Sequence, residues 1–332
     1  MTATLAITDL SVQFATERAV VHAVNGVSFS VERGQTVAIV GESGSGKSVT
    51  CLSLLQLLPR SARVAGSVRL EGRELLTLSE PEIRKIRGRG IGLVYQDPMA
   101  ALNPVRTIGA QVAEPLRLHL GLSRRAAAER AAELLGRVGI PAPREQLRAY
   151  PHEFSGGMRQ RVVIAMAIAC EPRVLLADEP TTALDVSVQA QILELLKNLT
   201  AELGISLVLV SHDLSVVAGL ADDVLVMYGG YLAEQGDAVA VFEHPAHPYT
   251  AGLLASIPDT APDPDAPLTG IAGQPPDMRS VPAGCVFAPR CPHAFGRCEQ
   301  RPPLEDRGPS HRAACWLGPE VNIGERAGLG AA

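Results

Sequence analysis

An octapeptide near the N-terminus constrains the fold more than any other stretch of the chain. Residues 41–48 read Gly-Glu-Ser-Gly-Ser-Gly-Lys-Ser, which matches the phosphate-binding loop pattern G-x-x-x-x-G-K-[ST]. The β-branched run at 36–40 predicts a buried strand before the loop. The apolar spacing from Ser48 to Leu58 predicts a helix after it, which Pro59 ends. Strand, glycine loop and helix therefore come in the order that a phosphate cradle requires.

The residue types of this loop suit the binding of a nucleotide. Its glycines let the backbone turn N–H groups around a phosphate without interference from Cβ atoms, and the positive end of the helix dipole favours an anion. Lys47 is predicted to reach the β- and γ-phosphates, and the Ser48 hydroxyl to ligate Mg²⁺. An accidental glycine-rich turn is the alternative, and the flanking strand and helix disfavour it.

Composition limits the remaining classes of protein. The 332 residues suffice for one large domain or for a domain with a smaller appendage, and 46% hydrophobic with 20% charged residues is typical of a globular chain. A net charge of −5 gives no reason to expect a nucleic-acid partner. No signal peptide is evident, and the longest apolar run, 162–170, is far shorter than the ~20 residues that span a bilayer. We expect a soluble, cytoplasmic chain that reaches a membrane only through a partner.

The order of the predicted elements indicates an α/β fold. Residues 5–40 alternate apolar and polar as short antiparallel strands do, with turns at 16–18 and 32–34, and a further strand is predicted over 64–70. A strand at 91–96 precedes an alanine-rich helical region at 99–171. Strands return at 174–177 and 205–210, with a helix of about 15 residues between them. This alternation predicts a mainly parallel sheet with an antiparallel β subdomain.

Composition changes after Ile257. Seven prolines between 258 and 282 predict a linker or loop rather than a sheet, and four cysteines follow them. We expect residues 5–257 to form the main domain, with a helical subdomain at about 98–172, and residues 258–332 to form the linker and a cysteine-containing extension. Cys51 and Cys170 stand singly in apolar helical stretches, which predicts small buried side chains.

Two further motifs suggest phosphate chemistry. Asp178 and Glu179 end an apolar strand. In a protein with a phosphate-binding loop, the first acid at such a position holds Mg²⁺ through its water shell, and Glu179 could polarise the water that attacks the γ-phosphate. Ser-Gly-Gly at 155–157 opens an apolar helix and predicts a second anion site, which could serve another molecule's nucleotide. Alone, that tripeptide is more typical of a helix-capping turn.

Six motifs in this order resemble the ATP-binding-cassette (ABC) ATPase family over roughly residues 5–257. They are the phosphate-binding loop, the strand-terminal Gln96, Ser155-Gly156-Gly157, Asp178-Glu179-Pro180, Ala183-Leu184-Asp185 and Ser211-His212-Asp213. The resemblance implies that Gln96 contacts Mg²⁺ or the attacking water and links the site to a membrane subunit. It implies that Ser155 and Gly157 touch the γ-phosphate held by the opposite subunit and that Asp185 crosses the dimer interface. His212 would hold the γ-phosphate, and Phe14 would stack on adenine unless it only packs within its strand.

The motifs and the resemblance predict three sets of site residues. The catalytic set is Glu179, His212 and Gln96, and the Mg²⁺ set is Ser48, Gln96 and Asp178. The nucleotide-binding set is Phe14, Gly41, Ser43, Gly44, Ser45, Gly46, Lys47, Ser48, Val49, Ser155, Gly156, Gly157 and Asp185. Phe154 and Met158 replace the leucine and glutamine that often flank Ser-Gly-Gly in the family, and the residue at position 14 is often Tyr. No phosphate-binding group is lost, so ATPase activity is expected.

The tail resembles the C-terminal extension of the ATPases of dipeptide and oligopeptide permeases. His247-Pro248-Tyr249-Thr250 and the cysteine-rich stretch carry this resemblance, together with residues 48–50 and 97–104. It implies the first of two ATPase subunits of a peptide importer at the cytoplasmic face of the cell membrane. Its partners would be a second, homologous ATPase, two transmembrane permease subunits and an extracytoplasmic solute-binding protein.

Two other functions stay open at this point. The related nickel importers share much of the tail pattern, so nickel or another small solute is an alternative cargo. A soluble ABC protein that acts on ribosomes or DNA is more remote, because such translation factors usually carry two cassettes and the DNA-repair members insert a long coiled coil.

The spacing of the tail cysteines, C-x5-C-x6-C-x16-C, raises the question of a metal. Disulfides are disfavoured in a cytosolic chain. Zinc sites usually contain a C-x2–4-C pair, which this chain lacks, whereas four thiolates at wider spacing can hold a 4Fe–4S cluster, as the resemblance implies for some relatives. We expect ATP, Mg²⁺ and a 4Fe–4S cluster on Cys285, Cys291, Cys298 and Cys315, with zinc or no metal as alternatives.

Overall fold

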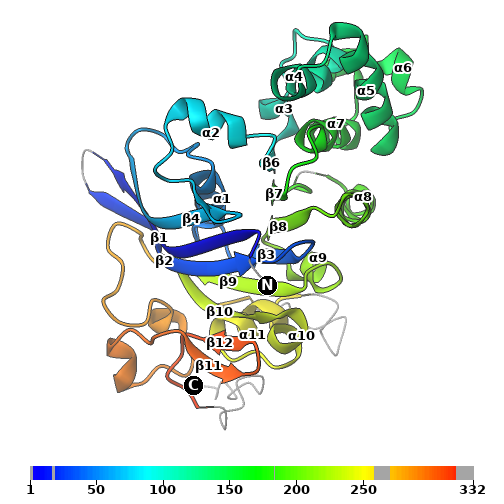
Figure 1. Ribbon diagram of the computed structural model, residues 1–332. Coiled ribbons are helices and arrows are strands. Elements are labelled where there is room, and N and C mark those ends of the chain that lie inside the picture. The colour runs from blue at the N-terminus through cyan, green and yellow to red at the C-terminus, as the bar shows by residue number, and fades with distance from the viewer. Residues whose placement is uncertain (1–2, 17–18, 183, 258–269, 319–332) are drawn as a thin grey trace. The chain divides into compact units, whose positions relative to one another are not determined.

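The chain divides into two compact units. The computed structural model describes residues 3–16, 19–182, 184–257 and 270–318, and Figure 1 labels its helices and strands. Unit 1 consists of Met1–Ala6, Ser30–Thr36 and Val68–Val210, and unit 2 of Ile7–Phe29, Val37–Ser67 and Ser211–Ala332. Five strands contribute residues to both units: β1 (Leu5–Ala15), β2 (Val20–Val31), β3 (Thr36–Val40), β4 (Ala62–Leu70) and β8 (Ser206–Ser211).

Unit 1 is built around parallel strands. They are β6 (Ile91–Val94), β7 (Val174–Asp178) and β8 (Ser206–Ser211), in the order β8-β7-β6. Every residue of β7 and β8 is buried, which explains their nearly continuous apolar sequences. The parallel register confirms the predicted sheet type and brings the carboxyl ends of these strands to one edge.

Helices fill the stretch in which the sequence predicts them. Figure 1 shows α3 to α7 gathered together, with α4 packed against α5 and α7. Thr107 and Ser123 accept hydrogen bonds from the first turns of α4 and α5, which sets where these helices begin. The bounds are α3 Pro98–Ala101, α4 Ile108–Leu120, α5 Arg124–Arg137, α6 Pro143–Gln146, the 3₁₀ turn η1 Pro151–Glu153 and α7 Gly156–Ile168.

Three more elements complete unit 1. The short strand β5 (Arg73–Glu74) pairs antiparallel with the end of β4, and α2 (Glu80–Ile86) follows it. Helix α8 (Val186–Leu203) joins β7 to β8 and ends at Gly204, whose φ of 62° is the left-handed conformation common at helix C-termini. This is the predicted helix between the two strands.

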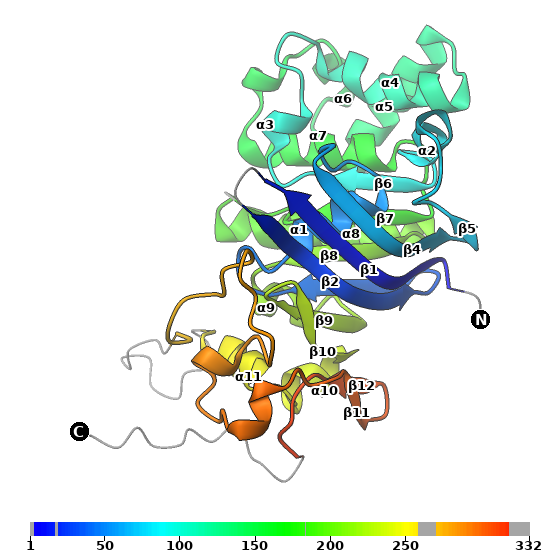
Figure 2. The same ribbon diagram turned by 90° about the vertical axis from the view of Figure 1, so that its left-hand side faces the viewer.

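Unit 2 contains β3 (Thr36–Val40), from Val37 onward, parallel to β9 (Asp223–Tyr228). Beyond β9 the sheet is antiparallel, in the order β11-β12-β10-β9-β3, and Figure 2 shows β11 and β12 beside β10. A second sheet in this unit has the order β2-β1-β4. The other elements are α1 Lys47–Leu54, α9 Leu214–Ala218, β10 Tyr231–Asp237, α10 Ala238–Glu243, α11 Pro248–Ala255, η3 Ala288–Arg290, η4 Gly296–Glu299, β11 Glu305–Gly308 and β12 His311–Ala313.

The strands of the C-terminal extension are a feature that the sequence did not reveal. β12 pairs antiparallel with β10, so that His311 lies opposite Gly236 and Ala313 opposite Glu234. His311 Nε2 and the fully buried Glu234 Oε1 are 2.7 Å apart, which adds a polar contact to the ladder. The extension therefore shares a sheet with the main domain. The domain boundary after residue 257 stays a prediction, because residues 258–269 lie outside the described part, as do 17 and 18 of the first predicted turn.

The predicted end of the first helix is wrong. α1 ends at Leu54, before Pro59, because Gln56 adopts a left-handed φ of 51°. The N–H of Leu57 donates to Leu52 O at 3.0 Å and that of Gln56 to Ser53 O at 3.1 Å, which together form the usual left-handed helix terminus. Proline is therefore not what ends the helix. Within the described residues, no helix is both long and apolar enough to cross a bilayer.

Candidate functional site

The predicted phosphate-binding loop connects β3 to α1 in unit 2. Gly41 has φ 147° and Gly46 has φ 102°. A Cβ atom at Gly41 would lie 2.2 Å from Met227 O, and one at Gly46 would lie 2.4 Å from Ala23 O. Both the backbone conformation and the close neighbours therefore require glycine at these two positions.

Polar groups inside the loop fit a phosphate. Lys47 is almost fully buried, and its Nζ donates to Gly41 O at 2.7 Å and to Glu42 O at 2.9 Å. Ser45 Oγ is buried without a hydrogen-bond partner within the part of the chain that the structure describes. Gly46 caps α1 without any side-chain hydrogen bond. A phosphate would supply the acceptors that a lysine, a serine hydroxyl and helix N–H groups require.

The other predicted residues of this unit lie in the loop, in the first turn of α1 or near the ends of strands. Ser43 and Gly44 are exposed in the loop, and Ser48 and Val49 are half-buried in the first turn of α1. Phe14 is half-buried near the end of β1, and His212 is exposed directly after β8. Their roles toward a nucleotide stay predictions.

Unit 1 brings Gln96 and Glu179 together. Gln96 Nε2 and Thr182 Oγ1 each donate to Glu179 Oε2 at 2.9 Å, and the Glu179 N–H donates to Val210 O at 3.0 Å. Glu179 has a φ of 45°, a left-handed conformation that is unusual for a glutamate and that these three bonds support. Asp178, the last residue of β7, is buried directly before it. The carboxylate of Glu179 is thus held in one orientation, as a group that orients water must be.

The predicted Ser-Gly-Gly element and Asp185 also lie together in unit 1. Ser155 caps α7, with its Oγ accepting from the Met158 N–H at 3.4 Å. A Cβ atom at Gly157 would lie 2.7 Å from Val188 Cγ1, and one at Gly156 would lie 3.4 Å from a methyl carbon of Leu184. The start of α7 therefore packs against the start of α8.

Asp185 is exposed and caps α8. Its carboxylate accepts from Ser187 Oγ at 2.6 Å and from the Val188 N–H at 3.0 Å, and these hydrogen bonds lower the pKa of Asp185. Asp185 is therefore ionised near neutral pH and negative at the helix N-terminus. Ala183, which belongs to the same predicted motif, lies outside the described residues.

Glu42 of the phosphate loop and two residues that contact it were not among the predicted site residues. The Tyr249 hydroxyl accepts from the Glu42 N–H at 2.8 Å, and Arg290 forms an ion pair with the Glu42 carboxylate at 2.7 Å. Tyr249 was noted in the sequence only as part of the His-Pro-Tyr-Thr motif, and no role at the nucleotide site was predicted for it. Nothing in the sequence linked Arg290 to the loop.

The four tail cysteines lie within range of one another's charge. Burial, with a smaller contribution from the charges of the other three cysteines, raises the pKa of Cys291 to about 11. Cys285 N–H donates to Cys298 O at 2.9 Å, so two of the cysteine backbones are adjacent. The six cysteines, all of which lie in the described part of the chain, form no disulfide bonds there, and Cys51 and Cys170 are buried as predicted. Among the described residues, however, no three Cys, His, Asp or Glu side chains are arranged to hold a metal ion.

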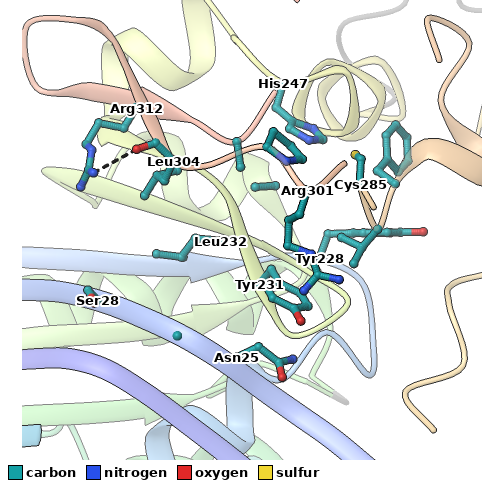
Figure 3. Close-up of a pocket in the computed structure, with 16 residues that line it drawn as sticks. Asn25, Ser28, Tyr228, Tyr231, Leu232, His247, Cys285, Arg301, Leu304 and Arg312 are labelled. Atoms are coloured by element: carbon teal, nitrogen blue, oxygen red, sulfur yellow. Dashed lines mark hydrogen bonds between the residues drawn. The ribbon is translucent and has the colours of Figure 1, made fainter. Parts of the chain in front are cut away.

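A separate cavity of about 270 Å³ lies in unit 2 between β9, β10 and the extension. Figure 3 shows Tyr231, Arg301 and Cys285 around it. Arg301 lies over the ring of Tyr231, 4.0 Å from the ring centre. None of the lining residues belongs to the octapeptide, so this cavity is not the predicted nucleotide site.

Comparison with known families identifies two regions of the chain. The family described as ABC transporter matches residues 24–182. The family described as oligopeptide/dipeptide transporter, C-terminal region, matches residues 233–298. The second match covers the His-Pro-Tyr-Thr motif and three of the four tail cysteines.

Curated relatives match nearly the whole chain. The oligopeptide transport ATP-binding protein OppD of Escherichia coli is 48% identical over 95% of this chain and 93% of its own length. The dipeptide transport ATP-binding protein DppD of Bacillus subtilis is 51% identical over 94% of each chain. A putative peptide import ATP-binding protein of Brucella abortus is 52% identical over 90% of each chain.

Solved structures share the fold of the main domain. The ATP-binding cassette MJ0796, as a dimer in a post-hydrolysis state with bound ADP and Pi, aligns with a TM-score of 0.63 and 29% identity over 70% of this chain and 98% of its own. The cbiO1 protein of Clostridium perfringens, part of the ABC transporter complex cbiONQ, aligns with a TM-score of 0.62 and 29% identity over 74% of this chain and 92% of its own.

Proposed function

The chain belongs to the ATP-binding subunits of oligopeptide and dipeptide ABC transporters, and from this premise we propose that it hydrolyses ATP to power the import of peptides. The observation that carries the proposal is the phosphate cradle at the start of α1. Gly41 and Gly46 cannot be replaced without a clash, and the loop contains the buried Lys47 and the hydroxyl of Ser45, which has no hydrogen-bond partner among the described residues. These are the groups that bind the β- and γ-phosphates of a nucleotide.

We assign the chemical step to the carboxyl ends of the unit 1 strands. ATP with Mg²⁺ supplies the phosphoryl group, and Ser48 and Asp178 would hold the ion together with Gln96. Glu179 would accept hydrogen bonds from the attacking water and take its proton, while Gln96 and Thr182 keep its carboxylate in place. His212 would orient the γ-phosphate.

The N-terminus of α7 supports the proposal that a second ATPase subunit completes the site. Ser155, Gly156 and Gly157 form a helix start with small side chains, which suits a phosphate brought by another subunit. The relative MJ0796 is described as a dimer. We propose a heterodimer with a homologous ATPase, docked at the cytoplasmic face of the membrane on two permease subunits that receive peptide from a solute-binding protein.

The test uses the whole transporter reconstituted in vesicles, with Lys47→Ala as the inactivating change and Lys85→Ala as the matched control on the exposed face of α2. Peptide uptake and phosphate release that both require Lys47, but not Lys85, support the proposal. Uptake of Ni²⁺ but not of peptides would replace peptides by a metal cargo. ATP hydrolysis without any cargo would leave a non-transport ATPase.

We also propose that the four tail cysteines hold an iron–sulfur cluster. The support is the donor chemistry, four unpaired thiols in a segment rich in proline, together with the family resemblance. The arrangement of the side chains gives no such support, and no step of the reaction is assigned to the cluster. Iron, sulfide and zinc per chain, measured on anaerobically purified protein and on Cys291→Ser, decide between a cluster, zinc and no metal.

A further inference from the structure

The phosphate-binding loop carries a carboxylate at its second position. Glu42 follows Gly41 in a loop whose backbone N–H groups and helix dipole are directed at an anion. A charge carried by so short a loop lies within about one Debye length, ~8 Å, of a phosphate held by the same loop. An uncompensated Glu42 would therefore repel the nucleotide that the loop binds.

The cysteine-rich extension supplies the compensating charge. Arg290 Nη1 donates to Glu42 Oε2 at 2.7 Å, and Nη2 donates to Oε1 at 3.0 Å, so the two groups meet as a fork. The side chain of Arg290 is only 4% exposed, whereas that of Glu42 is 26% exposed. A bidentate arginine–carboxylate pair is both stronger and more directional than a single contact.

Three further hydrogen bonds fix the direction of the Arg290 guanidinium. Nε donates to Ala272 O at 2.9 Å, Nη2 to Ile271 O at 3.1 Å, and Nη1 to the Tyr228 hydroxyl at 3.1 Å. The buried guanidinium thus has acceptors on all three of its nitrogens. A guanidinium fixed in this way determines the orientation of the carboxylate that it binds. A mobile surface arginine would instead move with its partner.

Other parts of the chain after residue 248 hold the same loop. The Tyr249 hydroxyl accepts from the Glu42 N–H at 2.8 Å, so both the backbone and the side chain of Glu42 are fixed. Pro275, Pro276 and Met278 line a small cavity together with residues 42–45 of the loop. The N–H of His22 on β2 donates to Met278 O at 3.0 Å, which attaches this segment to the sheet.

We propose that Arg290 is a positioning residue of the nucleotide site, which neutralises Glu42 and holds it away from the bound phosphates. The inference rests on the proposed function and deepens it, because it makes the extension a determinant of nucleotide affinity. Arg290 acts through Glu42 and does not itself touch the nucleotide. Loss of Arg290 leaves the negative charge of Glu42 in the loop and also leaves the loop less ordered before binding, and both effects weaken the binding of ADP and ATP.

The experiment measures the dissociation constant of MgADP for the full-length chain by calorimetry. The variants are Arg290→Met, Glu42→Gln and the double variant, and Arg279→Met is the matched control. Arg279 belongs to the same extension, but its side chain is 62% exposed and pairs with Asp277, two residues away. We expect Arg290→Met to raise the dissociation constant about tenfold, which corresponds to about 1.4 kcal/mol. Arg279→Met should leave it unchanged within about twofold.

The double variant tests whether the charge of Glu42 is responsible. In the Glu42→Gln background, Arg290→Met should weaken MgADP by no more than about threefold, because no carboxylate is left to neutralise. Hydrogen exchange of residues 41–48 should be faster in Arg290→Met than in Arg279→Met. In the assembled transporter the KM for ATP should rise while kcat stays within about twofold, whereas a loss of folded protein lowers the apparent kcat only.

Three outcomes overturn the inference. Arg290→Met could bind MgADP as tightly as Arg279→Met does, or Glu42→Gln could fail to suppress the effect of Arg290→Met. The third is that the weaker binding of MgADP accompanies a loss of bound metal, which is measured by metal analysis of each variant. If Arg290→Met does not fold, Arg290→Lys takes its place in the comparison with the wild type. Lysine keeps the positive charge but cannot form the two parallel hydrogen bonds, so Arg290→Lys should weaken MgADP binding about threefold. A wild-type chain that does not bind MgADP at all would instead contradict the proposed function.

Discussion

His247 makes the stability of unit 2 dependent on pH. The imidazole caps α11 and is 3% exposed, and its Nδ1 accepts from the Tyr249 N–H at 3.0 Å. Burial lowers the pKa of His247 from 6.5 to about 4. The carboxylate of Glu234 on β10 opposes this change, and the charge of Arg307 on β11 adds to it. Protonation would also place a hydrogen on the nitrogen that now accepts the capping bond.

The direction of the effect follows from the two pKa values. Below 6.5 the unfolded chain binds a proton at this histidine, but the folded chain does so only near 4. Stability therefore falls as the pH drops through this window and is constant, for this residue, below it. Between about pH 7.5 and about pH 5 the expected loss in the free energy of unfolding is about 2 kcal/mol.

The comparison variant is His247→Asn. Its amide oxygen can accept the Tyr249 N–H as an N-cap, and it does not titrate. Urea unfolding can be followed by the fluorescence of Trp316, the only tryptophan of the chain, whose Nε1–H donates to Gln300 O in the extension at 2.9 Å. We expect the wild type to lose about 2 kcal/mol more than His247→Asn between the two pH values. Equal losses, within about 0.5 kcal/mol, would refute the argument that burial keeps this ring neutral.

Three other substitutions test the site. Glu179→Gln should lower phosphate release by more than about a hundredfold while MgATP binding persists, and a loss of binding would contradict its role as the group that orients water. Gly157→Ala should lower the free energy of unfolding by about 1–3 kcal/mol in thermal denaturation, because its Cβ would lie 2.7 Å from Val188 Cγ1. A second change, Val188→Ala, should restore most of this stability. If it restores none, the clash is ruled out. Tyr249→Phe removes the acceptor of the Glu42 N–H and should cost about 1–3 kcal/mol, measured by urea unfolding; a cost near zero would show that water replaces the hydroxyl.

The sequence predicted the part of the fold that depends on local patterns. The order of strand, glycine loop and helix at 36–54, the two buried strands β7 and β8 and the helices at 98–168 all follow from periodicity and capping residues. The end of α1 could not be predicted in this way. It depends on the left-handed backbone conformation of Gln56, and glutamine has no strong preference for that conformation. β11 and β12 are short and polar, and only pairing makes them strands, of β12 with β10 and of β11 with β12.

The same distinction applies to the site. Gln96 and Glu179 were predicted from motifs and prove to be hydrogen-bonded. The pair of Glu42 and Arg290 could not be predicted, because with 30 basic and 35 acidic residues the chain offers far too many combinations for any one to stand out. A long-range ion pair leaves no local pattern in the sequence. The four tail cysteines are the opposite case, because they form a clear sequence pattern, yet among the described residues the arrangement of the side chains does not support the predicted metal.

The contacts of Glu42 can form only late in the synthesis of the protein. Its carboxylate pairs with a residue 248 positions later in the chain, and its N–H is bonded by one 207 positions later. A chain made from the N-terminus on the ribosome therefore presents the complete glycine loop long before either support exists. A fragment interrupted at residue 257 would contain Tyr249 and every motif of the nucleotide site, yet Glu42 would still lack the arginine that neutralises it. The phosphate loop can therefore gain this ion pair only after residue 290 has been synthesised.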